Sequence, residues 1–324
     1  MRKTTKMWFL TATSLILIGC IVFGGVMCVL KWDFTKLSTG RYESNQHEIT
    51  EKFNNISIET NTADVDFALS DDGKCRVECY EKRKSKHAVT VREDTLVIAV
   101  MDNRSWYDYI GINFGSPEIT VYLPKAEYAA LVVNQNAGDV AIPKDFRFEG
   151  ADLSLGTGDV NFFACATGLI RMKTSAGNVR VENISAGALD LSASTGRIVV
   201  SNVTCAGDIN INVSTGKTRL HNVEGKNLMS SGKTGDISLK NVMIAEKISV
   251  KRSTGDVSFD RTDASEVFAE TDTGDVVGSL LTNKVFITHT DAGRVDVPKS
   301  AVGGKCEICT DTGDIKITVE QFVD

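Results

Sequence analysis

The sequence Ser253-Thr254-Gly255-Asp256-Val257 is the clearest copy of a five-residue motif, and Asp311-Thr312-Gly313-Asp314-Ile315 is another. Successive copies lie 19 or 20 residues apart, measured between their glycines. A fixed period near 20 residues is typical of proteins built from stacked repeats. The ten glycines that mark the copies are Gly138, Gly158, Gly177, Gly196, Gly216, Gly235, Gly255, Gly274, Gly293 and Gly313.

The residues around each glycine alternate between apolar and polar. The position seven residues before the glycine is apolar in all ten copies, and the position two after it is apolar in nine, with Thr218 the exception. This alternation predicts two short strands per repeat, each with one buried face. Because like residues return at like offsets, we expect parallel stacking rather than hairpins, whose tight turns favour Asn-Gly or Asp-Gly over Thr-Gly. Residues 126–324 are therefore predicted to form an all-β solenoid of about ten coils.

The glycine is predicted to form the corner between the two strands, because it tolerates a positive φ. Asp follows the glycine in six copies, and we expect its carboxylate to bond nearby backbone N–H groups. The pattern lacks the shorter period of calcium-binding repeats, so no metal site is predicted. A second column predicts a hydrogen-bonded ladder along the stack; it consists of Asn183, Asn202, Asn222 and Asn241.

The first thirty residues differ from the rest of the chain. Residues 7–30 carry no charge, and the short tail 1–6 before them contains Arg2, Lys3 and Lys6. This stretch is long enough to cross the hydrocarbon core, and the positive tail favours an uncleaved signal-anchor with the remainder outside the cytoplasm. The alternative is a lipoprotein modified at Cys20, because Leu17-Ile18-Gly19-Cys20 is similar to a lipoprotein cleavage box. The polar residues 31–52 are interpreted as a linker.

Residues 53–125 are predicted to be an irregular first section of the same β structure. Residues 56–67 keep the apolar offsets of a coil, with Ala63 in place of the glycine. The insertion 101–117 breaks the pattern, and we expect its aromatic side chains to cover the open end of the stack. The alternative is a partner-binding loop, because exposed aromatic side chains are common in recognition. These side chains are Trp106, Tyr107, Tyr109 and Phe114.

Charge and motif content limit the function classes. The net charge of −6 argues against nucleic acid as a partner. A polysaccharide-cleaving β-helix would need an acid and a base on projecting loops, whereas these coils are uniform and the four histidines occupy unrelated offsets. Cys306-x-x-Cys309 has no second pair to complete a metal site, and in a strand its two thiols point to opposite faces. We therefore expect neither catalysis nor a cofactor.

The N-terminal span, the irregular strands ending in Ile119-Thr120-Val121-Tyr122-Leu123-Pro124 and the Thr-Gly-Asp-Val coils resemble a bacterial β-strand-repeat family known as "putative adhesins". The similarity covers roughly residues 53–319. The resemblance implies an exported or membrane-anchored β-repeat protein, and it offers no catalytic residues. We expect this protein to act without catalysis at the cell envelope, by binding a glycan or protein or by structural presentation. An accessory or sensor role in envelope stress is the alternative, and a polysaccharide-processing enzyme is a more distant one.

Overall fold

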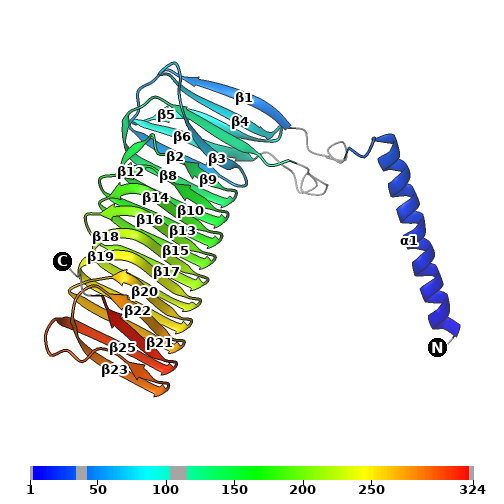
Figure 1. Cartoon of the computed structure of the whole chain (residues 1–324). Helices are drawn as coiled ribbons and strands as arrows, with labels where there is room; N and C mark the ends of the chain where they lie inside the picture. Colours follow the sequence, from blue (N-terminus) through cyan, green and yellow to red (C-terminus); the bar gives the residue numbers. More distant parts are fainter. Residues whose placement is uncertain (1–2, 34–41, 103–114, 321–324) are drawn as a thin grey trace.

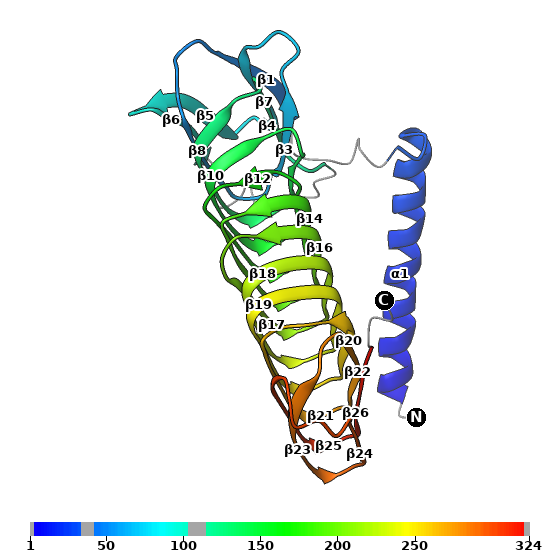
Figure 2. The same ribbon diagram turned by 60° about the vertical axis from the view of Figure 1, so that its left-hand side comes forward.

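The computed structural model describes residues 3–33, 42–102 and 115–320, which form helix α1 and strands β1 to β26 (Figure 1). The predicted β-solenoid of about ten coils is confirmed. The apolar N-terminal segment forms α1 (Lys3–Val29), and its stretch Thr5–Val29 is long and apolar enough to cross a membrane. The coils stack in parallel along a single axis (Figure 2).

Each regular coil has one strand before its corner glycine and one after it, and each strand pairs with its equivalent one repeat away. Leu189, for example, pairs with Ile209, and Ile198 pairs with Thr218. The strands before the corner are β8 (Glu127–Ala137), β10 (Arg147–Thr157), β13 (Leu169–Ala176), β15 (Ala188–Thr195), β17 (Ile209–Thr215) and β21 (Glu266–Thr273). The strands after it are β9 (Val140–Ile142), β11 (Val160–Phe162), β14 (Val179–Ala186), β16 (Ile198–Cys205), β20 (Val257–Thr262) and β22 (Val276–Leu280).

Each coil turns at its corner glycine and again at the position of the Asn column. The connection from the second strand of one coil to the first strand of the next is called the third corner. Two long strands, β18 (Thr218–Thr234) and β19 (Ile237–Thr254), run through it without a break. In an earlier coil, the short strand β12 (Cys165–Ala166) lies there. The length of the repeat varies between 19 and 20 residues. The register between β18 and β19 shifts between Gly225 and Asn227, so the extra residue is accommodated at the third corner.

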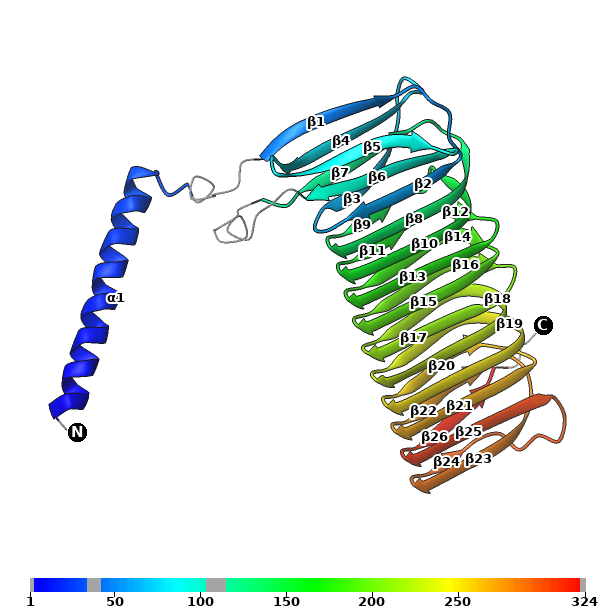
Figure 3. The ribbon, with the colours of Figure 1, turned by 180° about the vertical axis from the view of Figure 1, so that it is seen from behind.

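At the N-terminal end, the first coil in sequence is not the first coil in space. Strands β2 (Asn55–Thr60) and β3 (Asp64–Leu69) lie between β8 and β9 on one side and β6 (Thr95–Asp102) and β7 (Glu118–Leu123) on the other. Three antiparallel strands, together called the N-terminal cap, extend this end (Figure 3). They are β1 (Tyr42–Ile49), β4 (Cys75–Lys82) and β5 (Ser85–Arg92).

The cap corrects one prediction. The polarity of residues 42–49 predicts a linker, but these residues form β1 and pair with β4 along its whole length. Their polarity does not prevent pairing, because the antiparallel backbone hydrogen bonds to β4 hold the strand in place.

The C-terminal end is also interleaved. Strands β25 (Gly304–Thr312) and β26 (Ile315–Val319) lie between β21 and β22 on one side and β23 (Lys284–Ala292) and β24 (Val295–Asp296) on the other (Figure 3). Cys306 therefore pairs with both Val267 and Phe286. The last coil in sequence is thus paired along both of its edges, and the coil before it ends the stack.

The corner glycines are required for close stacking. Nine of the ten have φ between 121° and 154°, and Gly293, in the terminal coil, is the exception. A Cβ on Gly235 would lie 2.6 Å from the carbonyl carbon of Gly216 in the neighbouring coil, and closer still to its oxygen. Any larger residue there would force the two coils apart.

The Asp and Asn columns both bond along the stack. The carboxylate of Asp139 accepts a hydrogen bond of 2.8 Å from the backbone N–H of Asp159, one coil away. The same contact runs from Asp275 to the N–H of Asp314 and from Asp314 to the N–H of Arg294, following the interleaved order. In the predicted Asn ladder, each Nδ2 donates to the Oδ1 of the previous coil at 2.9–3.0 Å.

One arginine interrupts the apolar core. The side chain of Arg252 is almost fully buried. Its guanidinium donates to the carbonyl oxygen of Val213 at 2.8 Å and to Thr218 Oγ1 at 2.9 Å. Its Nε has no hydrogen-bond partner among the residues that the structure describes. Burial lowers the pKa of this guanidinium to about 10. Gly232 makes the room, because a Cβ there would lie 2.9 Å from Arg252 Cζ.

Candidate functional sites

Most of the insertion 101–117, namely residues 103–114, falls outside the described part of the chain. Trp106, Tyr107, Tyr109 and Phe114 all lie there, so both interpretations of this segment remain predictions. The described residues beside it form a contact between Tyr42 and Gly115, in which the Tyr42 hydroxyl donates to the Gly115 carbonyl oxygen at 2.7 Å.

The third corner carries a long groove, called the apolar groove, with a volume of about 1050 Å³. Small and apolar side chains from successive coils line it because each coil contributes the same corner position. They include Cys205, Ala206, Ile244, Ala245, Ala264 and Val302. Ala206 also lines a smaller groove of about 240 Å³, where Ala166 and Ala186 occupy the third corner of earlier coils. Together, the two grooves follow the third corner along much of the stack.

A buried ion pair lies in the wall of the apolar groove. Lys284 Nζ contacts Asp263 Oδ1 at 2.6 Å, and both side chains are less than a tenth exposed. Asp263 Oδ1 also accepts from the N–H of Ala264 at 2.8 Å, whereas Oδ2 is buried without a hydrogen-bond partner among the described residues. The groove therefore combines small and apolar side chains with a few polar ones, such as Glu224, Lys226 and Asn283.

A second groove, called the polar groove, lies beside the apolar one and has a volume of about 830 Å³. Asn202, Asn222 and Asn241 of the Asn ladder line it. Thr204, Glu224 and Met243 border both grooves, so the two share one ridge. Asn202 and Asn222 each use one N–H and one lone pair within the ladder, and Asn241 uses one N–H. Their remaining donors and acceptors can meet a ligand.

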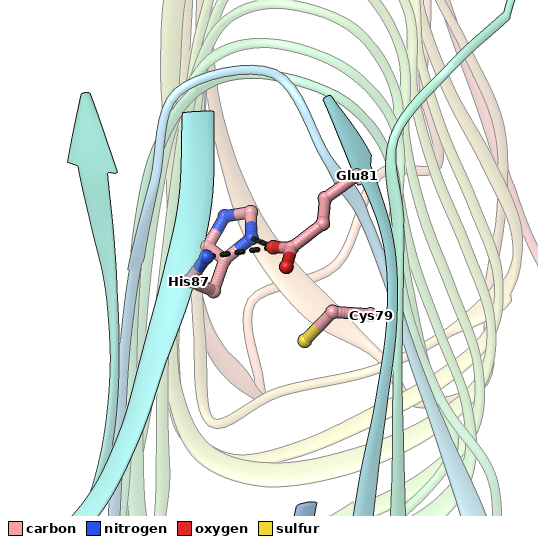
Figure 4. Close-up of side chains that lie close together, drawn as sticks. All are labelled: Cys79, Glu81 and His87. Atoms are coloured by element: carbon pink, nitrogen blue, oxygen red, sulfur yellow. Dashed lines mark hydrogen bonds and ion pairs between the residues drawn. The ribbon is translucent and has the colours of Figure 1, made fainter. Parts of the chain in front are cut away.

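The N-terminal cap contains a buried polar cluster of Cys79, Glu81 and His87 (Figure 4). Cys79 and Glu81 lie two residues apart on the inner face of β4, and His87 comes from β5. His87 Nδ1 contacts Glu81 Oε2 at 2.8 Å, and the Nε2 of the same ring contacts Thr60 Oγ1 at 2.9 Å. None of the sequence motifs indicated this cluster, although an acidic residue at a core position of a strand was a signal for it.

The cluster holds the residue types of a cysteine nucleophile with a base, but its geometry does not fit that role. Burial, with the nearby Glu81 charge as a smaller cause, raises the pKa of Cys79 to about 12. A thiol with such a pKa is not a thiolate near neutral pH, and Cys79 is fully buried. His87 directs its two ring nitrogens at Glu81 and Thr60 rather than at the sulfur.

The parallel coils, corner glycines and apolar N-terminal helix define a β-solenoid repeat protein. The chain belongs to the Toastrack DUF4097 family, whose model matches residues 53–318, and the resemblance seen in the sequence is thereby confirmed. No curated protein matches the chain.

Several crystal structures are similar to this chain at low sequence identity. One described as a putative adhesin from Parabacteroides distasonis is 14% identical, with 86% of this chain and 98% of that chain covered and a TM-score of 0.46. A second from the same organism, described as a putative lipid binding protein, is 14% identical with coverages of 87% and 98% and a TM-score of 0.47. A putative adhesin from Parabacteroides merdae is 12% identical, with the same coverages and a TM-score of 0.47. At these identities the likeness concerns the fold alone.

Proposed function

We propose that this protein is a single-pass membrane protein whose solenoid binds a surface ligand outside the cytoplasm without catalysis. The observation that carries the proposal is the pair of adjacent grooves along the third corner, because they offer one extended and repetitive binding surface. Ligand sites are commonly concave and mostly apolar, with a few placed polar groups. The apolar groove has this character, with polar residues such as Glu224, Lys226 and Asn283 among its lining.

The anchor is inferred from α1. The helix continues through Cys20 to Val29, and Cys20 lies within the apolar span rather than at its end. This supports an uncleaved anchor over lipidation at Cys20. The positive residues Arg2, Lys3 and Lys6 favour a cytoplasmic N-terminus.

A linear glycan is the ligand that we favour. The polar groove presents amide groups at the coil spacing of about 4.8 Å, so a polymer with hydroxyl groups along its length can bond several coils in turn. The adjoining apolar groove can take the less polar faces of sugar rings. A protein segment is the alternative ligand.

A blocking substitution tests the groove. Ala206 is exposed and lines both the apolar groove and the smaller groove of about 240 Å³. Ala206→Arg therefore fills the apolar groove without entering the core. The control is Asn212→Arg, which adds the same side chain at an exposed position of β17. We expect the full chain in detergent to bind envelope glycans on an array, Ala206→Arg to weaken that binding at least tenfold, and Asn212→Arg to leave it unchanged.

Equal binding by both variants would remove the groove from the proposal. Binding only to peptide arrays, with the same Ala206→Arg effect, would keep the groove and replace the glycan by a protein ligand.

A further inference from the structure

We propose that Cys79, Glu81 and His87 bind one divalent transition-metal ion, most suitably Zn²⁺, inside the N-terminal cap. The three side chains offer one sulfur, one oxygen and one nitrogen, and these ligand atoms all lie within 4.8 Å of one another (Figure 4). Zn²⁺ is commonly bound by thiolate, imidazole and carboxylate at roughly 2.0–2.3 Å. A tetrahedral ion could therefore contact all three atoms after small side-chain movements.

The position between His87 Nδ1 and Glu81 Oε2 is the natural place for the ion. These atoms are 2.8 Å apart and share a hydrogen bond, so the metal would replace the shared proton. That proton would move to His87 Nε2 or, where Nε2 is already protonated, to solvent, so that a neutral imidazole remains. The Cys79 thiol would release its proton to solvent as the metal–sulfur bond forms. One thiolate and one carboxylate then neutralise the two positive charges of the ion, and a neutral imidazole completes the set. A buried site of zero net charge limits the cost of desolvation.

The surrounding contacts already orient the ligands. Thr60 Oγ1 lies 2.9 Å from His87 Nε2, and by accepting from Nε2–H it would leave the Nδ1 lone pair for a metal. Asn45 Nδ2 donates to Glu81 Oε1 at 2.7 Å, and the His87 backbone N–H donates to Glu81 Oε2 at 2.6 Å, so both carboxylate oxygens are fixed in place. Oε2 then has one lone pair for the ion, the one that now faces His87 Nδ1. Such outer contacts are typical of metal-binding histidines and carboxylates.

Two further features fit an ion site. A crevice of about 10 Å³, lined by residues that include Thr60, Ser85 and His87, reaches one of the three proposed ligands. It has room for about one water molecule beside His87. In the same cap, His47 Nε2 is buried without a hydrogen-bond partner among the described residues. In β1, Asn45 pairs with Cys79 and His47 pairs with Val77, so His47 lies two residue pairs from the proposed ligand Cys79.

The expected role of the ion is structural. Cys79 and Glu81 belong to β4, which extends the sheet that contains β7, and His87 belongs to β5, which extends the sheet that contains β6. One metal ion would therefore join the two strands that lie over the end of the stack. This inference does not depend on the proposed glycan binding.

Cobalt substitution tests the site directly. The full chain, purified in detergent and treated with chelator, is titrated with Co²⁺ and separately with Zn²⁺. We expect one ion per chain, a sulfur-to-cobalt charge-transfer band and a higher melting temperature with Zn²⁺. Cys79→Ser should abolish the band, and Thr60→Val should weaken Zn²⁺ affinity about 10- to 100-fold. The matched control is Cys75→Ser, which changes a buried cysteine four residues away on the same face of β4 and should keep the band.

The parent chain decides the matter even if a variant does not fold. Absence of a sulfur-to-cobalt band in the parent at excess Co²⁺ would overturn the proposal and leave a hydrogen-bonded Glu81–His87 pair. A band that persists in folded Cys79→Ser would overturn it as well, because the sulfur ligand would then lie elsewhere.

Discussion

Gly235→Ala is expected to lower the free energy of unfolding by about 3–5 kcal/mol. A side chain at positive φ is strained, and here its Cβ would also overlap the backbone of Gly216 in the neighbouring coil. The atoms that the new Cβ would meet belong to the backbone of Gly216, so they cannot rotate away as the end of a flexible side chain can. Denaturant unfolding of the parent and the variant measures the difference.

Gly73→Ala is the matched control. Gly73 also has a positive φ, of 73°, but a Cβ at this position would meet no other atom within 4 Å, so only the conformational strain of about 1–2 kcal/mol should appear. If the two variants lose the same stability, close stacking of the coils is not what requires glycine at the corner.

Thr218→Val is expected to cost about 3 kcal/mol, because it leaves the buried Arg252 guanidinium without one of its two acceptors. Valine has nearly the shape of threonine, so the loss should come from the missing oxygen. Arg252→Met, which removes the buried charge, should be neutral or stabilising.

The double variant isolates this interaction. In the Arg252→Met background, Thr218→Val should cost almost nothing, since no charge remains to be satisfied. Equal losses from Thr218→Val in both backgrounds would show that Thr218 does not serve Arg252. Thermal or denaturant unfolding of the four proteins provides the comparison.

The regular part of the fold was predictable because every coil repeats the same local pattern of residues. A glycine corner, two alternating strands and an Asn column determine which residues stack. Thr218 is the one polar residue among those two positions after a corner glycine, and it accepts a hydrogen bond from the buried Arg252.

The order of the coils at the two ends was not predictable from the same pattern. Cys306 and Phe286 occupy the same offset from their glycines, so the residues of the last two coils fit either order. The connection 297–303 is long enough to permit the interleaved one. Strand β1 was missed because its inward positions Glu43, Asn45 and His47 are polar and show no apolar alternation.

The candidate sites depend on contacts between residues far apart in sequence. The grooves arise only when the third corners of several coils align, and no single repeat contains them. The cap cluster similarly needs Thr60, Glu81 and His87 to meet from three strands. Glu81, at a core position of β4, was the one local signal.

We infer that α1 anchors the chain in the membrane and that the solenoid lies outside the cytoplasm. Cysteine labelling in cells without a wall tests this topology, using a membrane-impermeant maleimide and a background in which the exposed Cys20 and Cys28 and the partly exposed Cys165 and Cys309 are serine. Met229→Cys places a thiol at a position that is 57% exposed on the solenoid, and Lys6→Cys places one in the N-terminal tail. We expect Met229→Cys to be labelled in intact cells and Lys6→Cys to be labelled only after the membrane is permeabilised. Labelling of Lys6→Cys in intact cells, with Met229→Cys protected until permeabilisation, would show the opposite orientation.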